Sequence, residues 1–232
     1  MSASGGPDLI TNGLVFCVDP ANPKSYSGGS SCKDLTLNNG IGTLTEVTLS
    51  ADKGFIFSNA GNSKIKFTRS FINKTNSTTY MAVVDLPPPI SFTAGGILAS
   101  TNNLFGGILL LYFYQSASSY GFEIFAGEDN GLNVVDVIYD IDSNLWKRRY
   151  ILAITIDSSK VNFYIDGILK LNEPHSYNIN NHNFINIGYD DTQFNTPIVP
   201  GQKIYQTMIY DRALTDGEIL QNYNSLKTRY RI

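Results

Sequence analysis

YQTMIYDRALTDGEILQNY, residues 205–223, joins an apolar strand to the start of a helix. Thr215 and Glu218 have the spacing of a capping box, in which hydroxyl and carboxylate groups satisfy the first free amides of a helix. Leu214 and Ile219 can pack together across this cap. The expected apolar stripe of the helix consists of Ile219, Leu220, Tyr223 and Leu226. We therefore predict one short amphipathic helix that lies against a sheet.

Upstream of this segment, short apolar runs alternate with turn residues, a pattern typical of an all-β sandwich. Asp166-Gly167 separates the runs 161–165 and 168–171, and Asp-Gly supplies the positive φ angles of a two-residue hairpin turn. The run 150–156 precedes this hairpin, so three consecutive antiparallel strands are expected. Further strands are expected at residues 97–100, 108–114, 120–126 and 133–139, the last two as an antiparallel pair. The predicted fold class is all-β, an antiparallel β-sandwich with one short C-terminal α-helix.

The composition limits the class of protein. The chain has 232 residues and a formal net charge of -3, without a basic cluster beyond residues 147–149, so nucleic acid is not an expected partner. The first residues lack the charged region and apolar core of a signal peptide, and no window approaches membrane-spanning length. We therefore expect a soluble protein made in the cytosol, with no membrane partner.

One domain is expected over residues 13–232, preceded by an N-terminal arm at residues 1–12. The arm is small and polar, which favours a segment outside the core. Its sequence leaves open whether it is docked or disordered. The candidate partner-binding residues in the arm are Pro7, Asp8, Leu9 and Ile10.

The two cysteines need no disulfide, because a chain of this length can bury a sufficient core without one. Cys17 lies in the apolar run 14–18 and is predicted to be a small buried hydrophobe. Cys32 lies in a Gly/Ser-rich stretch that is predicted to be a loop, where the thiol could be reached from solvent.

Three blocks of the sequence carry a family resemblance. The first is GLVFCVDPANPKSYSG at residues 13–28, and the second joins Trp146 to the predicted strands and the Asp-Gly hairpin. The third joins Ile187-Gly188-Tyr189 to Tyr-Asp-Arg-Ala-Leu at residues 210–214. Together they resemble concanavalin A-like or laminin-G-like jelly-roll domains of the type found in bacteriophage virion structural proteins. The tryptophan usual in the family's first block is replaced near Cys32.

The resemblance implies a non-enzymatic virion accessory protein, foremost a capsid decoration protein that displays a lectin-like sandwich. A tail or neck adhesin that binds host-surface glycans is the alternative. The implied partners are the major capsid protein or tail and neck components, with surface glycans and a second copy of the chain left open. The implied location is the virion, after synthesis in the host cytoplasm.

The sequence lacks the known catalytic motifs of this scaffold. Glycosidases on this scaffold use paired carboxylates, but no two glutamates fall in a Glu-x-Asp-x-Glu pattern. The five glutamates are interpreted as surface carboxylates, at positions Glu46, Glu123, Glu128, Glu173 and Glu218. His175 and His182 lack the spacing of a zinc site, and no nucleophile elbow or phosphate loop is present. An enzyme is therefore not predicted.

Calcium is the one cofactor that the sequence leaves open. The resemblance implies loop aspartates as ligands, and Asp190 and Asp191 are the candidates, although Asp-Asp pairs also form ordinary turns. The many tyrosines suit both a half-buried sheet and a sugar site, so no glycan-binding residues can be chosen.

Overall fold

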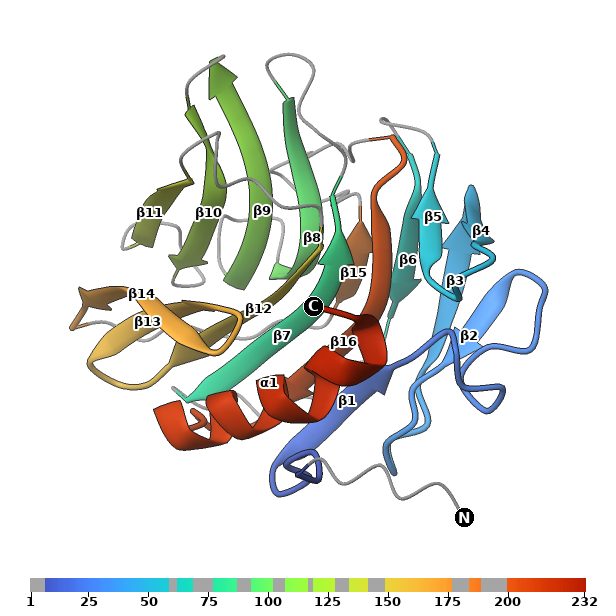
Figure 1. Ribbon diagram of the computed structural model, residues 1–232, viewed down its shortest axis with the longest axis horizontal. Helices are drawn as coiled ribbons and strands as arrows, with labels where there is room; N and C mark the ends of the chain where they lie inside the picture. The colour runs from blue at the N-terminus through green and yellow to red at the C-terminus, as the bar shows by residue number, and fades with distance from the viewer. Residues whose placement is uncertain are drawn as a thin grey trace.

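Two antiparallel sheets of eight strands each face one another in the computed structural model (Figure 1). The residues that the structure describes are 7–58, 62–68, 77–86, 93–101, 107–116, 119–127, 134–141, 149–176, 184–188 and 200–232. One α-helix, α1 (Asp216–Tyr230), lies along the outside of the first sheet. The predicted all-β sandwich with a C-terminal helix is confirmed.

The first sheet has the strand order β14-β13-β12-β7-β16-β5-β4, and β1 also pairs with β16. Its strands are β1 (Leu14–Val18), β4 (Val47–Leu49), β5 (Phe55–Phe57), β7 (Thr78–Asp85), β12 (Arg149–Ile156), β13 (Lys160–Ile165), β14 (Ile168–Pro174) and β16 (Lys203–Tyr210). The predicted hairpin is confirmed, because Asp166 and Gly167 join β13 to β14 with φ angles of 52° and 78°. The preceding strand, β12, pairs antiparallel with β13 as expected.

The second sheet has the strand order β11-β10-β9-β8-β15-β6-β3-β2. Its strands are β2 (Ser31–Lys33), β3 (Ile41–Thr45), β6 (Lys64–Phe67), β8 (Thr93–Thr101), β9 (Gly107–Ser116), β10 (Ser119–Gly127), β11 (Val134–Ile141) and β15 (Ile185–Gly188). The antiparallel pair expected from residues 120–126 and 133–139 is confirmed as β10 and β11.

Two apolar layers lie on opposite faces of the first sheet. The inter-sheet layer combines side chains of both sheets, whereas the second layer lies between the first sheet and α1. Central strands such as β7 are buried along their whole length because alternate residues serve the two layers. Tyr80 and Val84 point between the sheets, and Met81 and Val83 point toward the helix.

The helix begins with the predicted capping box. Thr215 Oγ1 accepts the Glu218 N–H at 3.3 Å, and Glu218 Oε2 accepts the Thr215 N–H at 2.9 Å. The predicted apolar stripe is wrong at one position, because Leu220 is 46% exposed. The buried line of the helix instead consists of Ile219, Asn222, Leu226 and Tyr230. In the described ranges, no helix is long and apolar enough to cross a membrane.

The cysteines lie in different layers and do not form a disulfide. Cys17 is a buried residue of the helix-side layer, as predicted. The expectation for Cys32 is wrong, because this residue is the centre of β2 and only 1% exposed. Strand alternation explains the burial, since the flanking Ser31 and Lys33 point outward. Burial raises the pKa of both thiols to about 12, so neither forms a thiolate nucleophile near neutral pH.

Candidate functional site

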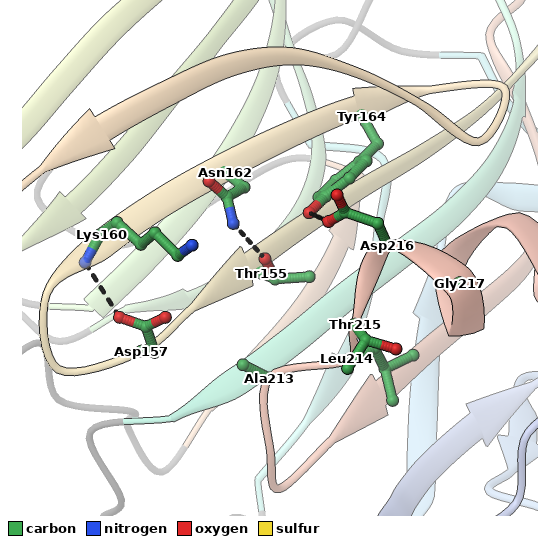
Figure 2. Close-up of a pocket in the computed structure, with 10 residues that line it drawn as sticks. All are labelled: Thr155, Asp157, Lys160, Asn162, Tyr164, Ala213, Leu214, Thr215, Asp216 and Gly217. Atoms are coloured by element: carbon green, nitrogen blue, oxygen red, sulfur yellow. Dashed lines mark hydrogen bonds between the residues drawn. The ribbon is translucent and has the colours of Figure 1, made fainter.

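A polar pocket lies where the β12–β13 hairpin meets the start of α1 (Figure 2). Strand alternation puts Ile154 and Phe163 between the sheets, so Thr155, Asn162 and Tyr164 face the outer side of the first sheet. The opposite wall is the pocket lip, residues 213–217, which consists of the end of the β16–α1 connection and the first two residues of the helix. The pocket has a volume of about 500 Å³, within the range of roughly 300–1,000 Å³ usual for small-molecule sites. Its lining residues are Thr155, Asp157, Lys160, Asn162, Tyr164, Ala213, Leu214, Thr215, Asp216 and Gly217.

The strand side of the pocket is held by side-chain hydrogen bonds. Asn162 Nδ2 donates to Thr155 Oγ1 at 3.2 Å, and Asn162 Oδ1 accepts a hydrogen bond from the Asn172 amide on β14. Asp157 ends the strand in a tight turn, in which its Oδ1 accepts the backbone N–H groups of Ser159 and Lys160. Although partial burial opposes it, hydrogen bonds from the Ser159 hydroxyl and from these two backbone N–H groups hold the pKa of Asp157 below its usual range, so the pocket keeps this negative charge.

The two walls are joined by one hydrogen bond. The Tyr164 hydroxyl donates to Asp216 Oδ1 at 2.8 Å. Burial, and then the hydrogen bond to Asp216, raises the pKa of Tyr164 to about 12, so this hydroxyl remains a donor at neutral pH. Two carboxylates and one ammonium group, from Asp157, Asp216 and Lys160, therefore line a site with fixed hydrogen-bonding groups.

The lip is fixed from outside the pocket. The backbone N–H of Leu214 donates to Thr79 Oγ1 at 2.9 Å, and the Thr79 hydroxyl donates to the Arg212 carbonyl at the same distance. The Arg212 guanidinium binds Glu218 with two hydrogen bonds, of 2.9 and 2.6 Å. Hydrogen bonds from Arg212 lower the pKa of Glu218 to about 2, so the capping carboxylate stays ionised.

Glu123 and Asp136 bring two carboxyl groups together on the second sheet, and no sequence motif indicates this pair. Phe122 and Ile124 point between the sheets, so Glu123 lies on the outer face of β10. The β10–β11 register pairs Glu123 with Ile138 and Phe125 with Asp136, which makes Glu123 and Asp136 diagonal neighbours on that face. Burial, followed by the charge of Asp136, raises the pKa of Glu123 to about 7. Glu123 therefore lies at the surface, as interpreted from the sequence, but it is only partly exposed and has a second carboxyl group beside it.

The structure describes some of the candidate site residues predicted from the sequence and not others. Asp190 and Asp191, the calcium candidates, lie outside the described residues, as does His182. Across the described ranges, no group of three His, Cys, Asp or Glu residues could hold a metal ion. Residues 8–12, here named the docked segment, lie against α1, and Leu9 and Ile10 pack on the helix-side layer. The sequence does not predict the pocket, because the hairpin and the lip lie far apart in the chain and meet only in the folded protein.

Comparisons with known proteins agree with this architecture. The sequence matches the family described as "Concanavalin A-like lectin/glucanases superfamily" over residues 59–220. No curated protein matches the sequence significantly.

Similar solved structures include receptor-binding domains of neurotoxins. The "Botulinum Neurotoxin Type G Receptor Binding Domain" aligns with a TM-score of 0.67 and 16% identity, over 92% of this chain and 51% of its own. The "Binding domain of Botulinum neurotoxin DC in complex with rat synaptotagmin II" aligns with a TM-score of 0.69 and 16% identity, over 92% and 52%. The same domain "in complex with SialylT" aligns with a TM-score of 0.69 and 16% identity, over 92% and 51%. The chain thus spans about half the length of these structures, and at such identities the likeness shows the fold alone.

Proposed function

The chain belongs to the concanavalin A-like lectin/glucanases superfamily, and from that premise we propose that it is a non-catalytic module that binds a glycan in the polar pocket. The observation that carries the proposal is the set of fixed polar groups on two walls of one pocket, joined by the Tyr164–Asp216 hydrogen bond. Sugar hydroxyls are both donors and acceptors, so they suit a site that offers carboxylate, hydroxyl, amide and ammonium groups together. Two proteins of similar fold lend support, one described in complex with SialylT and the other, botulinum neurotoxin type C, described as dependent on interaction with two ganglioside molecules for cell entry.

Hydrogen bonds within the pocket wall hold its polar side chains in place before a ligand binds. Thr155 and Asn162 are 2% and 7% exposed, and each is already held by its neighbour across the hairpin. Little side-chain entropy is then lost when a ligand binds, which favours affinity from a few hydrogen bonds. Asp157 and Asp216 are carboxylate acceptors for hydroxyl groups, and hydrogen bonds to charged groups are the stronger ones.

A glycan array followed by calorimetric titration tests the proposal. We expect the protein to bind at least one of lactose, sialyllactose and a chitin oligomer. Asp216→Asn keeps the shape of the side chain and removes its charge, so it should weaken binding roughly tenfold. Glu173→Gln, which neutralises a carboxylate of β14 outside the pocket lining, is the matched control. Absence of binding to the whole array, or equal binding by Asp216→Asn, would overturn the proposal.

The non-catalytic part of the proposal has its own assay. Glu123, whose pKa is raised, is a diagonal neighbour of Asp136, and these two carboxyl groups are the candidate for an acid–base dyad. Prolonged incubation with the bound glycan should give no new reducing ends. Products that disappear in Glu123→Gln would instead make this chain a glycan-cleaving enzyme.

Display of the module on a bacteriophage virion is a proposal supported by the sequence resemblance. Its partners there would be the major capsid protein, or tail and neck components in the adhesin alternative. Cryo-electron microscopy of purified parent particles tests both. Density for a 25.6 kDa sandwich repeated over the capsid lattice supports decoration, and density confined to the tail supports adhesion.

A further inference from the structure

The docked segment is held through its backbone by side chains of α1 and β16. Asn222 Oδ1 accepts the Ile10 N–H at 2.9 Å, and the Tyr210 hydroxyl donates to the Ile10 carbonyl at 3.0 Å. Gln221 Nε2 donates to the Asp8 carbonyl at 2.8 Å. Asn222 and Tyr210 are both fully buried, so their polar atoms would lose a partner if the segment left.

Arg212 connects this segment to the helix cap. Its Nε donates to the Asn12 carbonyl at 3.1 Å, while its two terminal nitrogens bind the Glu218 carboxylate. One planar guanidinium therefore makes all three bonds at once, and its fork geometry fixes Glu218 relative to the segment. The Arg212 side chain is 28% exposed, so solvent screens the pair only in part.

Glu218 in turn fixes the pocket lip. Its Oε2 accepts both the backbone N–H of Thr215 at 2.9 Å and the Thr215 hydroxyl at 3.1 Å. Thr215 lines the pocket and is followed by Asp216, whose carboxylate accepts the Tyr164 hydroxyl. A continuous set of side-chain hydrogen bonds thus runs from the segment through Arg212 and Glu218 to the ligand-facing side of the lip.

Gly13 connects the docked segment to β1. Gly13 has a φ of +81°, and a Cβ there would lie 2.9 Å from Asp211 Oδ1. The Gly13 carbonyl accepts the Asp211 N–H at 2.9 Å, which ties the base of the segment to the turn before the lip. The contacts of Asp8 and Ile10 lie outside the β1–β16 pairing, which begins at Leu14.

We propose that Arg212 is a positioning residue that couples docking of residues 8–12 to the conformation of the pocket lip. Release of the segment frees Arg212 from Asn12, loosens its grip on Glu218, and lets Thr215 and Asp216 move away from Tyr164. By reciprocity, a ligand that holds the lip in place also favours the docked segment. The effect on glycan affinity rests on the proposed function, whereas the coupling of segment to lip does not.

Hydrogen exchange of the Thr215 amide, followed by NMR in the full chain, tests the coupling without a ligand. Arg212→Lys keeps the charge and loses the fork, and Ile10→Asp places a carboxylate against the apolar layer and releases the segment. Each should speed exchange at Thr215 about fivefold, whereas amides of β12 should keep their rates. The double variant should exchange no faster than the faster single variant, because both changes break one connection.

Arg229→Lys is the matched control, since Arg229 binds Asp19 at 2.6 Å near the other end of the same helix and should not affect Thr215. If Ile10→Asp does not fold, Gln221→Ala removes one exposed contact to the segment and takes its place. Unchanged Thr215 exchange in a variant whose backbone amide at position 10 exchanges freely would overturn the proposal. Titration with lactose, sialyllactose and the chitin oligomer then distinguishes the two proposals. Weaker binding of any of these glycans by Arg212→Lys supports both, and the expected exchange pattern with binding to none of them overturns the glycan pocket alone.

Discussion

The two apolar layers of this protein differ in the part that hydrogen-bonding side chains play in them. The inter-sheet layer is dominated by hydrocarbon and phenyl side chains that meet edge to face, such as Phe16 and Phe67 with ring centroids 4.8 Å apart. The helix-side layer contains four buried tyrosines whose hydroxyl groups form hydrogen bonds with other residues of the chain. These tyrosines are Tyr164, Tyr205, Tyr210 and Tyr230. The first layer relies on burial, which has no direction, and the second on bonds that fix a helix, a segment and a pocket lip.

The largest expected effect lies in the inter-sheet layer. Phe163 is fully buried and packs against Phe122, with ring centroids 5.6 Å apart. Phe163→Ala should lower the free energy of unfolding by about 3–5 kcal/mol, because it removes burial and leaves a cavity. Urea denaturation measures the loss. Leu220→Ala, on the exposed side of α1, should cost less than about 1 kcal/mol, and equal losses would contradict the distinction between layers.

The helix-side layer should respond to loss of a single hydrogen-bonding group. Asn222 is fully buried, and its amide binds both the Ile10 N–H and the Tyr210 hydroxyl. Asn222→Leu keeps a side chain branched at Cγ but leaves these groups without partners, so it should cost about 2–3 kcal/mol. Asn224→Ala, which removes only a contact to Lys227, is the control with a cost below about 0.5 kcal/mol. A stable Asn222→Leu protein would mean that this layer, too, relies mainly on burial.

Local signals in the sequence predict the helix and the strands better than they predict how these elements pack against one another. The capping box at Thr215 and the Asp-Gly turn act over a few residues, so the helix start and the hairpin follow from the sequence alone. The rotation of α1 about its axis does not, because tertiary contacts, among them the bond from the Ile10 N–H, bury Asn222 and leave Leu220 exposed. The pocket likewise needs residues from two parts of the chain that lie far apart in the sequence.

The Glu123–Asp136 pair shows that a sequence can predict which strands pair without predicting their register. The antiparallel pairing of residues 120–126 with 133–139 can be predicted, but its register cannot, and a shift of one residue would turn Asp136 to the other face. The position of Glu123 beside Asp136 therefore follows only from the structure.

The Glu123–Asp136 pair should make the free energy of unfolding depend on pH. The pKa of Glu123 is about 7 in the folded chain, against about 4.3 in an unfolded one. Between these values the unfolded chain releases a proton that the folded chain keeps, so stability should fall as pH rises from about 4 to 7. The decline should be about 1–2 kcal/mol, allowing for solvent screening of a half-exposed group. Urea denaturation at several pH values measures it.

Glu123→Gln should remove this contribution and be the more stable protein at pH 8. It also makes the pair resemble the helix-side layer, because a glutamine amide can donate to the Asp136 carboxylate. An identical pH dependence in wild type and Glu123→Gln would contradict the shared environment of the two carboxyl groups.

The smallest effect concerns a polar group in the inter-sheet layer. Thr207 pairs with Ala82 on one side and Val18 on the other, and both neighbours belong to that layer. Its hydroxyl is buried and makes no hydrogen bond within the described part of the chain. Thr207→Val exchanges this hydroxyl for a methyl group of similar size, so it should raise the free energy of unfolding by about 0.5–1 kcal/mol. Thr79→Val is the control with the opposite sign, because the Thr79 hydroxyl binds the turn before α1. If both substitutions destabilise the protein equally, a hydroxyl is worth the same in either layer, and the contrast between burial and directed bonding fails.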